Sequence, residues 1–264
     1  IDISNKLFQF STDIHLQELL KNEYLSIVNV LGRLKRCLSQ KHQSNIRFTD
    51  DSNKPRFHHD MQFGSSGNSH GQFNVPAYIC GNINGDIFVS DVLNHRIQKF
   101  TSNGNYILSF GSFGDSIGFF NQPCGIMCDK NNNLFVCDSL NHRVQKFTSN
   151  GKYIMSWGTL GDKAGHFNSP HSICQDKKGF LYITERANHR IQKFTPDGEF
   201  VLSFGKQGNK DGEFLQPIGI CYHNGMILVG EKATDKIQIF DLDGNFIKSF
   251  NYSRETTLNM QGTS

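Results

Sequence analysis

The sequence predicts an all-β protein made of repeated four-stranded units, and three observations lead to this fold class. Prolines recur every 47 residues, at Pro76, Pro123, Pro170 and Pro217. Each repeat contains an Asn-Gly or Asp-Gly pair, which is a strong signal for a tight β-hairpin. Each repeat also contains short segments in which polar and apolar residues alternate, as they do in half-buried strands. Four strands per repeat of this length are typical of a β-propeller blade.

The first full repeat shows the expected elements in order. Residues 79–80 are a short apolar segment, and a turn is expected at 84–85. Residues 87–89 form a β-branched and aromatic run, which favours a second strand. Residues 96–100 alternate with period two, and an Asn-Gly hairpin then leads to a last strand at 106–110. The order strand, turn, strand, loop, strand, hairpin, strand predicts one blade.

Aromatic residues return at fixed positions of the repeat in three series. The first series is Phe73, Phe120, Phe167 and Phe214; the second is Phe100, Phe147, Phe194 and Phe240; the third is Phe63, Phe110, Trp157, Phe204 and Phe250. Because each ring buries roughly 150–250 Å², one blade alone cannot cover them. We therefore expect them to form the core between neighbouring blades.

The repeat also carries a specific motif. Asp91 is followed by Asn94-His95-Arg96-Ile97-Gln98-Lys99-Phe100, with Gly-x-x-Gly and Gly-Gln-Phe-Asn-x-Pro upstream. This pattern resembles the NHL repeat and covers about residues 57–250, as four full copies and a partial copy that ends at Gly64. The resemblance implies an NHL-type β-propeller of four-stranded blades, a fold that commonly has six blades in the tripartite-motif ubiquitin ligases.

The residues before the repeats have a different pattern, which predicts a helical segment over 1–43. Apolar residues with the spacing of a coiled-coil seam are Leu20, Tyr24, Ile27, Leu31, Leu34 and Leu38. The alternative is an amphipathic helix packed on the propeller. We expect a polar linker at 44–56, the propeller at 57–250 and a polar tail at 251–264.

The order of coiled coil, linker and NHL repeats resembles the C-terminal part of tripartite-motif ubiquitin ligases. In that family a RING and a B-box precede the coil, bind zinc and recruit the E2 enzyme. Neither is present in this sequence, so we expect it to be a piece of a longer protein, with zinc only in the missing domains and no cofactor here. Self-association through the N-terminal helix is a further expectation.

Charge and composition narrow the class of partner. The net charge of +3 comes entirely from residues 1–56, where nine basic residues face six acidic ones, so the predicted propeller is neutral. A neutral domain has no overall attraction for a phosphate backbone, although a local patch can still bind one. No apolar run is long enough to cross a membrane. An odd number of cysteines, seven, without a secretory leader favours reduced thiols and a cytoplasmic location.

The Asn-His-Arg triplets have a structural interpretation. Residues five positions apart have opposite charges in every copy: Asp91 and Arg96, Asp138 and Arg143, Glu185 and Arg190, Glu231 and Lys236. Because each pair flanks a tight loop between neighbouring strands, we expect ion pairs that brace the loops. The triplets lie one per blade, so they do not converge on a catalytic centre.

Neither a catalytic nor a metal-binding set emerges from the sequence. Peptide-amidating lyases have a similar fold with central metals, but the expected inner strands here are apolar, with His171 and His223 the only imidazoles close by. Cys80, Cys174 and Cys221 share a repeat position with Met127, which indicates a site for an apolar group. Cys124 and Cys128 are a candidate pair, with nothing else suggesting redox chemistry.

Surface recognition is the remaining function. One rim of a propeller collects the loops between blades and the loops before the third strands. The candidate binding residues on this rim are Leu93, His95, Phe113, Phe119, Leu140, His142, His166, Arg186, His189, Lys206, Lys210 and Lys232. Aromatic anchors beside polar groups suit a protein substrate. The alternative is single-stranded RNA, whose bases stack on such rings while Lys and Arg hold the phosphates.

Overall fold

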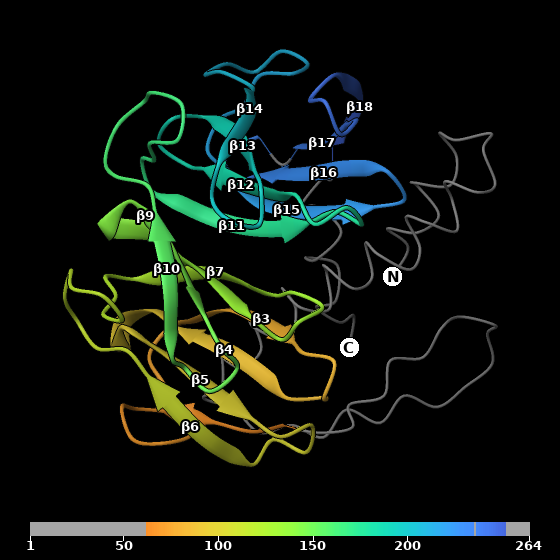
Figure 1. The fold of residues 1–264 in the computed structure, drawn as a ribbon. Coiled ribbons are helices and arrows are strands. Elements are labelled where there is room, and N and C mark those ends of the chain that lie inside the picture. The colour runs from red at the N-terminus through yellow and green to blue at the C-terminus, as the bar shows by residue number, and fades with distance from the viewer. Residues whose placement is uncertain (1–61, 235, 252–264) are drawn as a thin grey trace, which may run out of the picture.

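A computed structural model describes residues 62–234 and 236–251, and these residues form four four-stranded antiparallel blades (Figure 1). Blade 1 is β3 (Pro76–Gly81), β4 (Ile87–Asp91), β5 (Arg96–Phe100) and β6 (Tyr106–Phe110); blade 2 is β7 (Pro123–Cys128), β8 (Leu134–Asp138), β9 (Arg143–Phe147) and β10 (Tyr153–Trp157). Blade 3 is β11 (Pro170–Gln175), β12 (Leu181–Glu185), β13 (Arg190–Phe194) and β14 (Phe200–Phe204); blade 4 is β15 (Pro217–His223), β16 (Met226–Glu231), β17 (Lys236–Phe240) and β18 (Phe246–Asn251). The all-β propeller prediction is confirmed.

The remaining elements are short. Two 3-10 turns, η1 (Val92–Asn94) and η2 (Ser139–Asn141), join the second strand of a blade to the third. A parallel pair, β1 (Ser65–Ser66) with β2 (Gln72–Phe73), precedes blade 1. Within the described ranges, no helix has the length and hydropathy needed to cross a membrane. The predicted helical segment, the linker and nearly all of the polar tail lie outside the described residues.

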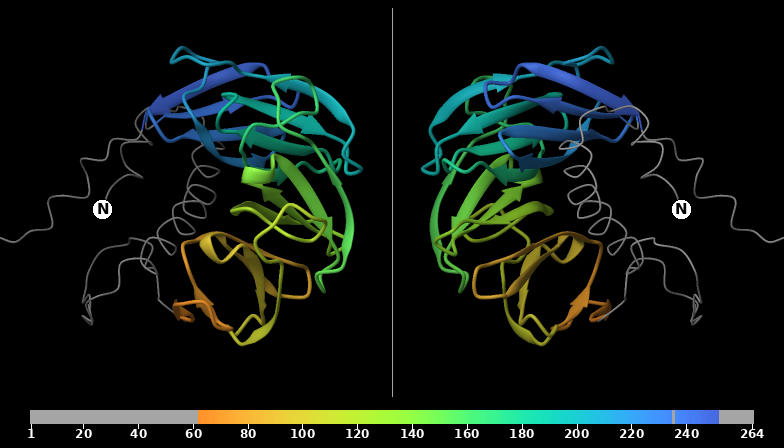
Figure 2. Two further views of the ribbon diagram at one scale, coloured as in Figure 1. Left: turned by 90° about the vertical axis from the view of Figure 1, so that its left-hand side faces the viewer. Right: turned by 90° about the vertical axis from the view of Figure 1, so that its right-hand side faces the viewer.

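The blades follow one another around an arc, with blade 1 and blade 4 at its two ends (Figure 2). The chain enters each blade at its inner strand, β3, β7, β11 or β15, and leaves from the outermost strand. Neighbouring inner strands lie side by side along the arc. This arrangement brings the starts of all four inner strands to one end of the propeller axis.

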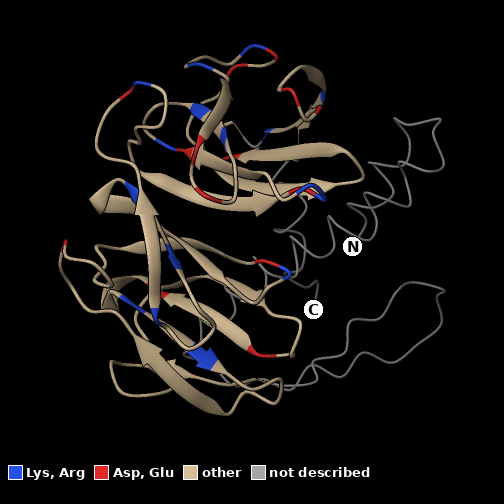
Figure 3. Ribbon diagram, viewed as in Figure 1, with Lys and Arg blue, Asp and Glu red and all other residues tan. Residues whose placement is uncertain are grey.

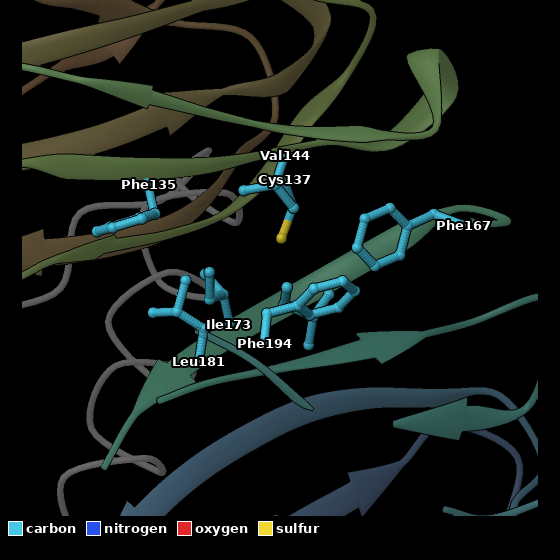
Figure 4. Packing of buried hydrophobic residues seen from close by; sticks show 8 residues of the cluster. Phe135, Cys137, Val144, Phe167, Ile173, Leu181 and Phe194 are labelled. Atoms are coloured by element: carbon cyan, nitrogen blue, oxygen red, sulfur yellow. The ribbon is translucent and has the colours of Figure 1, made fainter. Parts of the chain in front are cut away.

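The core lies between blades, as the aromatic series predict. In each blade the ring on the third strand packs against the other two series, with Phe147 5.1 Å from Phe110 of the preceding blade and 5.5 Å from Phe120. Figure 4 shows the interface of blades 2 and 3, where Phe135 and Val144 of blade 2 face Phe194 of blade 3. These side chains are fully buried, so each interface excludes water from apolar surface of both blades.

The hairpins between third and fourth strands are shaped by glycine. Gly151 has φ +78°, a conformation that residues with a Cβ rarely adopt. A Cβ at this position would lie 2.7 Å from Cδ1 of Phe110 in blade 1. Glycine is therefore required both by the turn and by the approach of a ring from the preceding blade.

Candidate binding face

The rim face is the end of the propeller at which the inner strands begin. It comprises the loops between blades, 64–75, 111–122, 158–169 and 205–216, and the loops before the third strands, 92–95, 139–142, 186–189 and 232–234. In Figure 1 β11 runs from left to right, so the rim face lies at the left, and the left view of Figure 2 looks onto it. All twelve predicted binding residues lie in these loops.

A buried carboxylate joins the loop between two blades to the loop before the third strand, as blade 2 shows. Asp138 is fully buried and accepts hydrogen bonds from the backbone N–H of Asn121 at 2.7 Å and from Asn141 Nδ2 at 2.9 Å. Its Oδ2 also accepts from Arg143 Nε at 2.7 Å and from Gln145 Nε2 at 3.1 Å. These bonds join the loop between blades 1 and 2 to blade 2. Burial raises the pKa of Asp138 above its usual value despite these donors.

The arginine of the motif extends this network to the neighbouring loop. Arg143 Nη2 donates to the carbonyl oxygens of Ser116 at 2.9 Å and Phe119 at 3.0 Å. The same pattern recurs around Asp91 with Arg96 and around Glu185 with Arg190. Three of the four predicted ion pairs are thus present, and they hold the interblade loops in place.

The fourth pair is different from the prediction. Lys236 Nζ lies 2.9 Å from Asp211 Oδ1, while Glu231 accepts from the backbone N–H of Leu215 at 2.6 Å and from Gln238 Nε2 at 2.9 Å. Lysine has no planar guanidinium that could bind a carboxylate and two carbonyl oxygens together. The ammonium group of Lys236 instead contacts the exposed Asp211 and donates to the Lys210 carbonyl oxygen at 3.3 Å, both in the interblade loop.

Three of the predicted rim histidines also hold the scaffold. His95, His142 and His189 each adopt a left-handed backbone conformation, and their Nδ1 atoms accept from the backbone N–H of Gln122, Ser169 and Gln216 at 3.1–3.2 Å. The acceptor role of Nδ1 corresponds to the neutral tautomer with its proton on Nε2. Burial lowers the pKa of His142, which also favours the neutral ring. The fourth histidine, His166, contacts Thr159 Oγ1 through Nδ1 at 3.1 Å.

The apolar candidates are exposed and gather on blades 1 and 2. Phe113 is 68% exposed, and Leu93, Phe119 and Leu140 are exposed as well. Phe113 also contacts the ring of His95 edge-on, with centroids 4.9 Å apart. The structure adds three exposed apolar residues that were not singled out from the sequence: Val75, Ile117 and Leu160. Leu160 occupies the same repeat position as Phe113, and this correspondence could have identified it.

The basic candidates lie on blades 3 and 4. Lys206, Lys210 and Lys232 are exposed, but Lys206 Nζ lies 3.4 Å from Glu213 Oε1. Figure 3 shows acidic and basic segments next to one another in the loops of these two blades. The positive charge of this side of the rim is therefore partly balanced by its own acidic residues.

At the centre of the rim face, two side chains from blades 1 and 3 meet a backbone carbonyl group of blade 4. The Tyr78 hydroxyl lies 2.7 Å from both His171 Nδ1 and the Ile218 carbonyl oxygen, and His171 Nδ1 lies 3.0 Å from the same oxygen. Burial, together with the smaller effect of the nearby charges of Arg186 and Lys232, lowers the pKa of His171 to about 4. His171 is thus neutral at pH 7. The three hydrogen-bonded groups link blades 1, 3 and 4 near the propeller axis.

The described part of the chain holds no group of three or more His, Cys, Asp or Glu side chains arranged to bind a metal ion. His171, at the centre of the rim face, is engaged in hydrogen bonds to Tyr78 and the backbone. The rim face presents exposed apolar side chains near blades 1 and 2 and exposed lysines near blades 3 and 4, on loops that a buried polar network braces.

Comparison with known proteins identifies the type of repeat. The family model of the NHL repeat matches residues 120–147 and 167–194, which run from Phe120 through β9 and from Phe167 through β13. Both matches lie in the β-propeller, where they cover the first three strands of blades 2 and 3. A search of curated proteins gives no match.

Solved structures with the same fold have diverse roles. A catalytically inactive virginiamycin B lyase from Staphylococcus aureus, solved with quinupristin, aligns with a TM-score of 0.53 and 20% identity, covering 67% of this chain and 55% of the lyase. A nidogen/laminin complex aligns with a TM-score of 0.53 and 16% identity, covering 68% of this chain and 65% of that one. This chain thus spans little more than half of the lyase. At such identities the likeness shows the propeller fold alone.

Proposed function

We propose that this NHL-type propeller is a recognition module whose rim face binds a protein partner. The observation that carries the proposal is the exposure of Phe113, Leu140 and their apolar neighbours on loops held rigid by buried ion pairs. Large apolar side chains that are exposed in the free protein and already fixed in place lose little entropy on binding. They therefore suit the anchor role that aromatic and aliphatic residues have at protein interfaces.

The resemblance of the sequence to tripartite-motif ligases extends this proposal. In such a protein the propeller would hold the substrate while a RING elsewhere in the parent chain recruits the E2 enzyme. No catalysis is proposed for the described residues. The test of this extension is ubiquitin transfer by the parent protein to a partner that the rim face binds.

Single-stranded RNA is the alternative ligand. The exposed lysines of blades 3 and 4 favour it, whereas the pairing of Lys206 with Glu213 and the neutral charge of the propeller disfavour it. Because phosphate contacts dominate nucleic-acid affinity, an RNA site would depend on Lys210 and Lys232. A protein site would depend on Phe113 and Leu140.

Two double variants and one single control variant of the 264-residue chain distinguish protein binding from RNA binding. Phe113→Ser with Leu140→Ser removes apolar anchors, and Lys210→Ala with Lys232→Ala removes cations. Ile83→Ser is the matched control, because Ile83 is 72% exposed but lies in a turn at the opposite end of blade 1. Each variant is used for quantitative affinity purification from cells and for selection of a random single-stranded RNA pool, after its melting temperature has been compared with that of the parent.

The expected result is a set of proteins that bind the parent and Ile83→Ser but not the Phe113→Ser, Leu140→Ser variant. Direct binding of one such purified protein to the Phe113→Ser, Leu140→Ser variant should then be at least tenfold weaker than binding to the parent. Equal retention of proteins by this variant and by the control would refute the proposal. Enrichment of an RNA motif that depends on Lys210 and Lys232 would replace it with the RNA function.

A further inference from the structure

Two cysteine thiols from different blades lie in contact. Cys80 is on β3 in blade 1 and Cys128 is the last residue of β7 in blade 2, and their sulfur atoms are 3.5 Å apart. Both residues are partly buried, and both are reduced. The sequence had suggested Cys124 as a partner for Cys128, but four residues along a strand span about 13 Å. The structure brings Cys128 to Cys80 instead.

Repeat symmetry does not impose this contact. The position of Cys80 in the repeat is occupied in blade 2 by Met127, so Cys128 is displaced from it by one residue. The positions equivalent to Cys128 are Gly81, Gln175 and Tyr222 in the other blades. Cys occupies the Cys80 position in three of the four blades, whereas Cys128 is the one cysteine at its own position, so the pairing arises at one particular interface.

We propose that Cys80 and Cys128 form an oxidisable dithiol, a modification site at which a small-molecule disulfide of the glutathione class creates a covalent bridge between blades 1 and 2. A disulfide requires the sulfur atoms to approach to about 2.05 Å. The remaining gap of about 1.5 Å would be closed by side-chain rotation and an adjustment of the neighbouring strands β3 and β7. This inference is independent of the proposed binding function.

The reaction consists of two balanced thiol–disulfide exchanges. The Cys128 thiolate attacks oxidised glutathione, so that a mixed disulfide forms on Cys128 and one glutathione thiolate leaves. The Cys80 sulfur then attacks the Cys128 sulfur, loses its proton and releases the second glutathione. In sum, two protein thiols are oxidised to one disulfide and one oxidised glutathione is reduced to two thiols.

Burial of the Cys80 sulfur assigns Cys80 to the second step. Burial raises the pKa of Cys80 well above its usual value, so that Cys80 remains a thiol until the mixed disulfide is next to it. The bridge would join residues 48 positions apart in the sequence. Because such a cross-link restricts the unfolded chain, the oxidised protein should melt at a temperature several degrees higher.

The test is oxidation of the folded 264-residue chain with oxidised glutathione at pH 8, followed by intact mass measurement and peptide mapping without reductant. Cys124 and Cys128 lie on one tryptic peptide, between Lys99 and Lys130. The Cys124→Ser variant therefore assigns the bridge, and Cys128→Ser serves as the variant that cannot form it. Dithiothreitol is added afterwards to test reversal.

We expect the loss of two hydrogen atoms and a peptide linked through Cys80 and Cys128, in the parent and in Cys124→Ser but not in Cys128→Ser. The melting temperature should rise on oxidation in the first two proteins and return with dithiothreitol. Failure of the folded chain to form this linkage, persistence of glutathione on Cys128, or an equal yield of bridges in Cys128→Ser would each overturn the proposal.

Discussion

Arg143 shows how one side chain can hold two segments that are distant in the sequence. Its guanidinium binds a fully buried carboxylate through Nε and two carbonyl oxygens of the interblade loop through Nη2. A planar group with donors in fixed directions suits these three acceptors, and lysine cannot reproduce them. The blade with a lysine at the equivalent position, Lys236, binds an exposed aspartate instead.

At the residue scale, Arg143→Ala should destabilise the protein by about 3–5 kcal/mol, because it leaves Asp138 charged and buried without its ionic partner. Urea unfolding followed by tryptophan fluorescence measures the change. Lys152→Ala, at an exposed position of the same blade, should change stability by less than about 0.5 kcal/mol. An unaltered unfolding midpoint combined with loss of partner binding would show that Arg143 recognises the ligand directly.

The hairpin between β9 and β10 illustrates how an element is shaped by its neighbour as well as by its own turn. Gly151 donates its backbone N–H to the Thr148 carbonyl oxygen at 2.9 Å, which closes the turn. The ring of Phe110 from blade 1 occupies the space where a side chain would begin. Gly118, in an interblade loop, has a similar φ of +81° but open space at its Cβ position. Alanine substitutions at the two positions therefore separate the energetic cost of backbone strain from the cost of a packing clash.

At the element scale, Gly118→Ala should cost about 1–2 kcal/mol, the strain of placing an alanine in the left-handed region. Gly151→Ala should cost at least about 1 kcal/mol more, because the Phe110 ring must also move. The free energies of unfolding of the two variants in urea provide the comparison. Equal losses would mean that the ring moves aside freely and that the contact has no role in holding blade 1 against blade 2.

The whole molecule is joined across its axis by the contact of Tyr78, His171 and Ile218. Blades 1 and 3 are not neighbours in the arc, so this contact links parts of the chain that the blade-to-blade core does not connect. The pKa of His171 is about 4 in the folded protein, against about 6.5 in an unfolded chain. The unfolded state therefore binds the proton more readily than the folded state.

At the scale of the whole molecule, stability should fall as the pH decreases from 6.5 towards 4, because the unfolded state gains a proton that the folded state excludes. Above pH 6.5 both states are neutral at this site and no pH dependence arises from it. His171→Gln removes the titration, so the difference in unfolding free energy between parent and variant should shrink by up to about 3 kcal/mol between pH 7 and pH 4. Parallel pH profiles would contradict the assignment.

Much of the fold could be predicted from the sequence because its signals are local. The 47-residue spacing, the hairpin glycines and the alternation of polar and apolar residues each act within a single blade. The three aromatic series also indicated which residues form the core, since rings at one repeat position must meet the next blade. The pairs of Asp91 with Arg96 and Asp138 with Arg143 could be predicted because tight loops bring residues five positions apart together.

The candidate site was predictable only in part. The exposed apolar residues Phe113 and Leu140 were found from their place in loops, whereas the role of His142 as an acceptor for the next blade was not. That role depends on a backbone N–H of Ser169, whose position is set by the packing of blade 3. No local pattern in the sequence encodes such a distance.

The sequence by itself determined the blade, its four strands and the apolar surfaces that blades must bury. The tertiary structure decided which groups meet across blades: Tyr78 with His171 at the axis, Cys80 with Cys128 between two inner strands, and Lys236 with Asp211 in place of Glu231. The physical reason is the distance along the sequence over which each kind of interaction acts. Strand alternation and turn geometry act over a few residues, whereas these contacts join residues as far as 93 positions apart and depend on how the blades curve around one axis.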